Sequence, residues 1–150
     1  MVKSIVDKVA DAVARKQQSA ELQLHRARMI RASAPDLFRS LTNKVAEVMN
    51  GLAATAPGDR LAFEKIPSNG FKVSKSTVPG VVLNVNLNLD AQRIEIRGSK
   101  SQGLEFDQAY SDDFVKIRLD GQDELTLTTN GDEFTSVADL AEWIISKLFR

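Results

Sequence analysis

The strictest constraint on the fold is the stretch Val81–Leu89, in which every second residue is apolar and three intervening residues are asparagine. Successive side chains of a β-strand point to opposite faces, so this period-two pattern places all the apolar side chains on one face. A helix would instead spread them around its circumference. The stretch therefore predicts a half-buried strand in a sheet with one polar face.

Shorter segments with strand-like patterns lie on both sides of this stretch, and turn-forming residues separate most of them. The predicted strands are Arg60–Ile66, Phe71–Lys75, Val81–Leu89, Arg93–Arg97, Phe114–Leu119 and Glu124–Thr129. Short turns connect antiparallel neighbours, so we expect an antiparallel meander sheet of about 5–7 strands. The segment Gly98–Asp113 is less regular, with a short strand expected around Leu104–Phe106, and Asn130-Gly131 is expected to end the last strand.

The N-terminal region predicts a long helical segment. Residues 3–32 contain no Gly or Pro and carry a thin, alanine-rich apolar stripe. The sequence Ser33-Ala34-Pro35-Asp36 is typical of a helix start, which predicts either two helices or one helix kinked at Ser33–Pro35. Gly51 is expected to stop the helix that follows. A helix over residues 3–32 is longer than a small sheet needs, so residues 1–32 are expected to form an appendage that can project.

The C-terminal helix is predicted from a cap and a broad apolar stripe. Ser136 precedes the stripe and Asp139 follows three residues later, which is typical of a capped helix start. The stripe comprises Val137, Leu140, Ala141, Ile144, Ile145 and Leu148. Helices over residues 34–50 and 137–149 can cover the apolar face of the sheet. The sequence thus predicts one α+β domain over residues 1–150.

Composition removes several classes of site. The chain has no Cys, which excludes disulfides, thiolate metal sites and a cysteine nucleophile. No apolar run is long enough to cross a membrane, and no signal-peptide core is visible at the start. We therefore expect a cytoplasmic protein without membrane contact.

A search for catalytic and metal-binding patterns also predicts none. The single histidine, His25, lies among arginines, and the acidic residues near Asp112 lack the spacing of a calcium loop. Gly98–Gly103 lacks the Lys and Ser/Thr that follow the second Gly of a phosphate loop. We expect no catalytic residue, no cofactor and no metal. An enzyme that uses two carboxylates among Glu105, Asp107, Asp112 and Asp113 is the third hypothesis.

One candidate surface is the polar face of the sheet. The residues predicted to lie there are Lys72, Asn84, Asn86, Asn88, Arg93, Arg97, Lys116 and Arg118. Basic and amide side chains of this kind can bind an anionic ligand or a nucleic-acid backbone. Only Phe114 offers an aromatic ring for stacking, which counts against RNA. A solvated face with cross-strand pairs is the simpler interpretation.

The second candidate surface is the first helix, with association residues Ile5, Val9, Val13, Ala20 and Leu24. Pairing with another copy, or packing on a partner protein, would bury this stripe. The net charge is zero, but residues 1–100 carry +7 and residues 101–150 carry −7, which can steer partners of opposite sign. The leading prediction is a non-catalytic protein-binding or adaptor module that self-associates as a homodimer. The alternative is a binder of anionic ligands or nucleic acid through the polar face.

Overall fold

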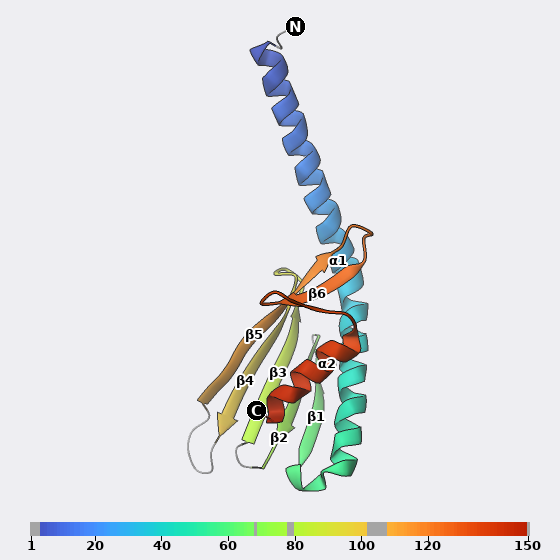
Figure 1. Ribbon diagram of the computed structural model, residues 1–150, viewed down its shortest axis with the longest axis vertical. Helices are drawn as coiled ribbons and strands as arrows, with labels where there is room; N and C mark the ends of the chain where they lie inside the picture. The colour runs from blue at the N-terminus through green and yellow to red at the C-terminus, as the bar shows by residue number, and fades with distance from the viewer. Residues whose placement is uncertain (1–3, 68, 78–79, 102–107, 150) are drawn as a thin grey trace.

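The computed structural model describes residues 4–67, 69–77, 80–101 and 108–149 of the chain. One long helix precedes a seven-stranded sheet, and a short helix follows it (Figure 1). The elements are α1 (Ile5–Thr55), β1 (Leu61–Ile66), β2 (Gly70–Lys75), β3 (Gly80–Asn88), β4 (Arg93–Ser101), β5 (Gln108–Leu119), β6 (Leu125–Thr129), β7 (Asp132–Phe134) and α2 (Val137–Ser146). Short 3-10 helices follow α1 at Pro57–Asp59 (η1) and α2 at Lys147–Phe149 (η2).

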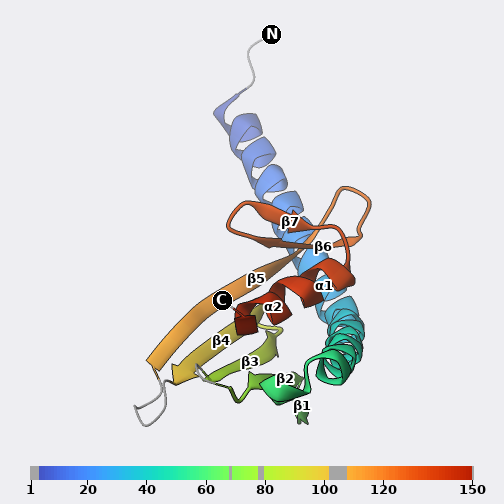
Figure 2. The same ribbon diagram turned by 60° about the horizontal axis from the view of Figure 1, so that its bottom comes forward.

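All neighbouring strands are antiparallel and lie in sequence order from β1 to β7, which confirms the predicted meander. The register aligns apolar residues in rows across the strands, such as Phe71 with Val85 and Val85 with Ile96. These side chains are completely buried. The C-terminal half of α1 and α2 cover this face, and Figure 2 shows α2 crossing the sheet beside α1. The α+β architecture expected from period-two alternation is therefore confirmed.

The long helix continues through Pro35 without a break. A proline inside a helix removes one backbone hydrogen bond and strains the preceding turn. Here Ile30, Ala34, Phe38 and Leu41 on both sides of it are buried in one core. Burial of these side chains outweighs the cost of about 3 kcal/mol for a proline in a helix. Of the two predicted forms, one helix rather than two is therefore the correct one.

Several predicted boundaries are wrong. Gly51 lies inside α1, which continues to Thr55. At this end of the helix, the Thr55 hydroxyl and the Ala56 backbone N–H both donate to the carbonyl oxygen of Leu52. Gly98–Asp113 is mostly strand, since β4 extends to Ser101 and β5 begins at Gln108. The short strand expected at Leu104–Phe106 lies outside the described residues.

Asn130-Gly131 does not end the sheet but turns the chain into β7, a strand that the sequence patterns missed. Both residues have positive φ, 45° and 86°, as a two-residue hairpin turn requires. The Asn-Gly pair is itself a strong hairpin signal. The strand was missed because Asp132–Phe134 is too short to show alternation.

Two turns at one end of the sheet mark where α1 leaves the domain. Arg31 of α1 lies 2.7 Å from Asp90 in the β3–β4 turn, and His25 lies 3.9 Å from Asp123 in the β5–β6 turn. Both pairs are exposed to solvent, so they orient the helix more than they stabilise it. We call residues 4–26 the projecting half of α1; Figure 1 shows it in blue, extending away from the sheet.

The C-terminal helix begins as predicted, with the Ser136 hydroxyl accepting the backbone N–H of Asp139 at 3.1 Å. Leu140, Ala141, Ile144 and Ile145 of α2 are buried against the sheet. Within the described part of the chain, no helix is long and apolar enough to cross a membrane.

Candidate interaction surfaces

The strand register brings all eight predicted polar-face residues to the side of the sheet opposite the helices. Lys72, Asn84 and Arg97 align in one row across β2, β3 and β4. Asn88, Arg93 and Lys116 align in a second row across β3, β4 and β5. Asn86 lies between these rows, and Arg118 follows Lys116 on the same face of β5. We call this surface the polar face.

Part of the polar face is held by its own ion pairs and hydrogen bonds. The Asn88 amide donates to Oε1 of Glu95 at 2.9 Å, and Arg93 Nε donates to the same oxygen at 3.1 Å. The hydrogen bond from Asn88 is the largest influence on Glu95 and, with Arg93 and Arg97 nearby, lowers the pKa of that carboxyl despite partial burial. Lys72 lies 3.4 Å from Glu64 on β1. These contacts, within β4 and between neighbouring strands, satisfy charges within the sheet and leave fewer groups for a ligand.

Acidic residues reduce the net positive charge that the alternation pattern predicts for this face. Glu64 aligns with Lys72, Asp112 aligns with Arg97, and Glu133 aligns with Thr128. Sequence reasoning counted only Glu95 there, because the partner of a β1, β5 or β7 residue depends on strand register. The polar face is therefore close to electrically balanced.

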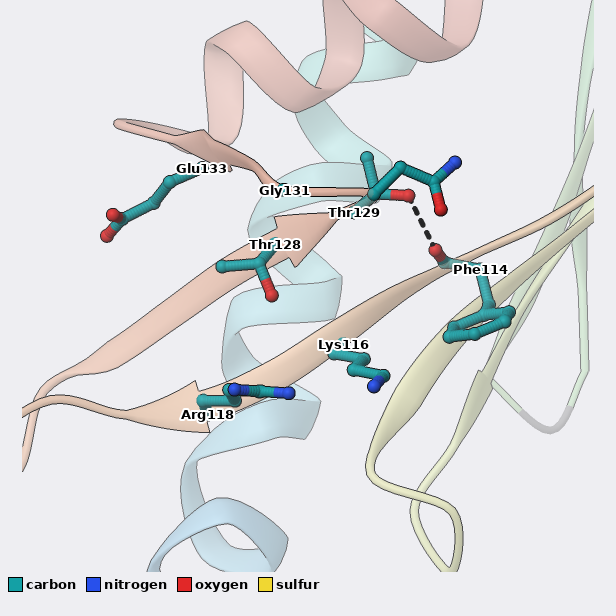
Figure 3. Close-up of a pocket in the computed structure, with 8 residues that line it drawn as sticks. Phe114, Lys116, Arg118, Thr128, Thr129, Gly131 and Glu133 are labelled. Carbon is teal, nitrogen blue, oxygen red and sulfur yellow. Dashed lines mark hydrogen bonds between the residues drawn. The ribbon is translucent and has the colours of Figure 1, made fainter.

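One groove on this face is lined by two basic side chains, Lys116 and Arg118 (Figure 3). It has a volume of about 420 Å³ and is lined by Phe114, Lys116, Arg118, Thr128, Thr129, Asn130, Gly131 and Glu133. The Arg93 guanidinium lies 4.8 Å from the centre of the Phe114 ring, and Lys116 Nζ lies 6.0 Å from it. The Thr129 hydroxyl donates to the Phe114 carbonyl oxygen at 2.9 Å and holds β6 beside β5. Among the described residues, neither Lys116 nor Arg118 forms an ion pair. We call this the Phe114 groove.

The predicted association residues all lie on the projecting half of α1. From Ser4 to Arg26, every side chain except partly buried Asp11 is exposed. The exposed fractions are 80% for Ile5, 76% for Val6, 56% for Val9 and 49% for Val13, and Leu22 and Leu24 are about half exposed. Large aliphatic side chains in this number along one free helix are unusual for a solvated element.

The exposed stripe continues the buried face of the same helix. Stepping back from Ala34 and Ile30 by three or four residues leads to Ala27, Ala20, Val13, Val9 and Val6, with Gln23, Gln17 and Lys16 interrupting the line. Residues at this spacing lie on one side of a helix. The stripe of the projecting half therefore lies on the same side of α1 as Ile30 and Ala34, which pack in the core. In the described part of the chain, no segment covers this stripe.

A pocket lies where this stripe meets the domain. It has a volume of about 490 Å³ and is lined by Gln23, Arg26, Ala27, Ile30, Gln92, Ile117, Arg118 and Leu119. Ala27, Ile30, Ile117 and Leu119 supply apolar walls, whereas Arg26 and Arg118 supply positive charge. We call it the basal pocket. Sequence reasoning missed it because its walls come from segments far apart in the chain.

The third hypothesis requires two carboxylates that converge on one site. The two candidate carboxylates that the structure describes, Asp112 and Asp113, do not converge. Asp112 and Asp113 are consecutive on β5, so their side chains point to opposite faces of the sheet. Asp113 lies on the covered face, where it binds Lys147, while Glu105 and Asp107 lie outside the described residues. The described residues contain no cluster of three or more His, Asp or Glu that could hold a metal ion.

Comparison of the chain with protein-family models, with curated proteins and with solved structures found no match.

Proposed function

We propose that this protein is a non-catalytic protein-binding or adaptor module that self-associates through the projecting half of α1. The observation that carries the proposal is the exposed aliphatic stripe of Ile5, Val6, Val9 and Val13, on a helix that extends beyond its own domain. At 1.5 Å per residue, the 23 residues of the projecting half extend about 35 Å, which is long enough for a helix pair of several turns.

The energetics favour a covered rather than a solvated stripe. Helices without tertiary packing are only marginally stable in water, and most helical stability in proteins comes from burial of an apolar side. Each valine or isoleucine that a partner covers contributes about 1.5–3 kcal/mol when fully buried. Ala20 lies on the same side of the helix as Val9 and Val13 and is small enough to let a second helix approach closely. A second copy of the chain supplies a stripe of the same composition.

The test is sedimentation equilibrium of the full chain at micromolar concentration, for wild type and two single variants. Val9→Lys places a charge in the stripe and is expected to weaken self-association at least tenfold. Gln18→Lys is the matched control, since residue 18 lies about 180° around the helix from residue 9 and gains the same charge. A monomeric wild type would disprove self-association, and equal effects of the two variants would disprove the role of the stripe.

The alternative function is binding of an anionic ligand at the Phe114 groove, favoured by Lys116 and Arg118, which form no ion pair among the described residues. The test is fluorescence anisotropy of a labelled single-stranded oligonucleotide at low and high salt. Binding that weakens with salt and is lost in Lys116→Ala/Arg118→Ala would support it. Lys72→Ala is the control, since Lys72 is already paired with Glu64. No anisotropy change at low salt would exclude nucleic-acid binding.

A further inference from the structure

We infer that the Phe114 groove and the strand edge beside it bind a phosphorylated, extended segment of a partner protein. The inference rests on the proposed adaptor function and adds the site and the chemistry of the partner. β4 pairs with Gln108–Lys116 of β5, whereas β6 pairs only with Lys116–Leu119. On the β6 side, residues 108–115 therefore have no neighbouring strand in the described part of the chain, and Figure 1 shows this part of β5 at the outside of the sheet. We call this side of residues 108–115 the open edge.

The open edge offers backbone groups to an added strand. The Asp120 N–H donates to the Glu124 carbonyl oxygen at 2.9 Å across the β5–β6 turn, so the even-numbered residues of β5 direct their backbone N–H and C=O groups toward β6. Beyond the end of β6, Asp112 and Phe114 direct these groups to the open edge. The hydrogen bond of 2.9 Å from the Thr129 hydroxyl to the Phe114 carbonyl oxygen agrees with this direction. An extended peptide can therefore add to β5 by backbone hydrogen bonds.

The Phe114 groove, next to the open edge, holds positive charge that no acidic residue neutralises. Among the described residues, Lys116 and Arg118 form no ion pair, and the Thr128 hydroxyl, aligned with Lys116, forms no hydrogen bond. Lys116 Nζ lies 6.0 Å from the centre of the Phe114 ring, so it reaches toward the open edge. Figure 3 shows the carboxylate of Glu133 pointing away from Lys116 and Arg118. Two cations and a hydroxyl suit a phosphate monoester, which carries about −1.5 to −2 charge and three acceptor oxygens.

The distribution of charge distinguishes this ligand from a nucleic acid. A nucleic-acid strand carries a negative charge at every nucleotide, but the polar face beyond the groove is close to balanced, with Lys72 beside Glu64 and Arg97 aligned with Asp112. The unpaired cations therefore suit one phosphate rather than a row of phosphates. Their side chains are also exposed, whereas a small-molecule site encloses most of its ligand. This geometry suits a phosphate that a larger molecule presents.

The test is fluorescence anisotropy of the full chain with a labelled peptide of alternating Thr and Val, with a central phosphoserine and one Lys to lie near Asp112. The same peptide with unmodified serine is expected to bind about tenfold more weakly at low salt, because it lacks the charge-assisted hydrogen bonds of the phosphate. Lys116→Ala/Arg118→Ala should remove this difference. Lys72→Ala is the control and should keep it, since Lys72 is paired with Glu64. Absent binding, or equal binding of the two peptides, would overturn the inference.

A proline tests the open edge separately. Asp112→Pro removes a backbone N–H from the open edge and keeps the pairing with β4, because the backbone groups of Asp112 point away from β4. Phosphopeptide binding should be lost, although the variant also removes an acidic charge that repels phosphate. Asp112→Asn is the matched control, since it removes the same charge, keeps the N–H and should bind at least as well as wild type. Urea denaturation checks that both variants are folded. Unchanged binding by folded Asp112→Pro would overturn the addition of a strand.

The outcomes separate this inference from the proposed functions. Sedimentation equilibrium measures self-association without a peptide, so failure of the phosphopeptide to bind leaves that proposal intact. If the single-stranded oligonucleotide binds through Lys116 and Arg118 and the phosphopeptide does not, the groove binds nucleic acid and the inference is overturned. If neither probe binds, the alternative function fails together with the inference.

Discussion

Nζ of Lys147 lies 2.5 Å from Oδ2 of Asp113, joining the C-terminal 3-10 helix η2 to β5 on the covered face of the sheet. The Lys147 side chain is 7% exposed and lies over the Trp143 ring, with Nζ 4.3 Å from its centre. Trp143 in turn packs on Phe134 of β7. The C-terminal segment is thus held to the sheet by a charge pair as well as by its apolar stripe.

Asp113→Asn should lower the free energy of unfolding by about 2 kcal/mol, because it removes the carboxylate charge that lies 2.5 Å from the buried Lys147 ammonium. Asp112→Asn is the matched control, since the neighbouring side chain points to the solvated face, and it should change stability by less than about 0.5 kcal/mol. Urea denaturation measures both. Equal losses would mean that the ion pair does not stabilise the C-terminal segment.

Glu95→Gln should reduce stability by about 1 kcal/mol or less at neutral pH and by nothing in acid. The folded state lowers the pKa of Glu95, chiefly through the hydrogen bond from Asn88. Its contribution is therefore fully present above the ordinary pKa of an unfolded glutamate and disappears as pH falls through the lowered folded value. The measurement compares urea midpoints of wild type and variant from about pH 7 to about pH 3. A difference that stays constant over this range would contradict the assignment.

Pro35→Ala should raise the free energy of unfolding by about 1–3 kcal/mol, because α1 is continuous and an alanine restores the missing backbone hydrogen bond and helix propensity. Thermal denaturation followed by circular dichroism measures the change. A loss of stability would instead show that the packing of α1 depends on the shape that Pro35 imposes.

Ser33 and Ser136, which both stand at predicted helix starts, should respond differently to alanine. Ser136 accepts the Asp139 N–H, so Ser136→Ala should cost about 1 kcal/mol. Ser33 lies exposed inside α1, so Ser33→Ala should be neutral or slightly stabilising. Denaturant titration of the two variants tests this. A comparable loss for Ser33→Ala would indicate that a helix begins there after all.

For the polar face, period-two alternation predicts which side of the sheet a residue faces but not which residues of other strands lie beside it. The pattern correctly groups Asn84, Asn86 and Asn88 on one side of β3, because side-chain direction in a strand is a local property. It does not reveal that Glu64 faces Lys72 or that Asp112 aligns with Arg97. Those neighbours depend on strand order and register, which long-range pairing sets.

The sequence by itself determined the α+β class, the antiparallel order of most strands, the Ser136 cap and the exceptional length of the first helix, since each follows from short-range periodicity, propensity or turn chemistry. Only the tertiary structure decided that α1 passes through Pro35, that Asp113 pairs with Lys147, and that Ala27, Ile117 and Leu119 share one pocket. The physical reason is that burial and charge pairing act between residues that the folded chain brings together, and their free energies override local preferences of a few kcal/mol.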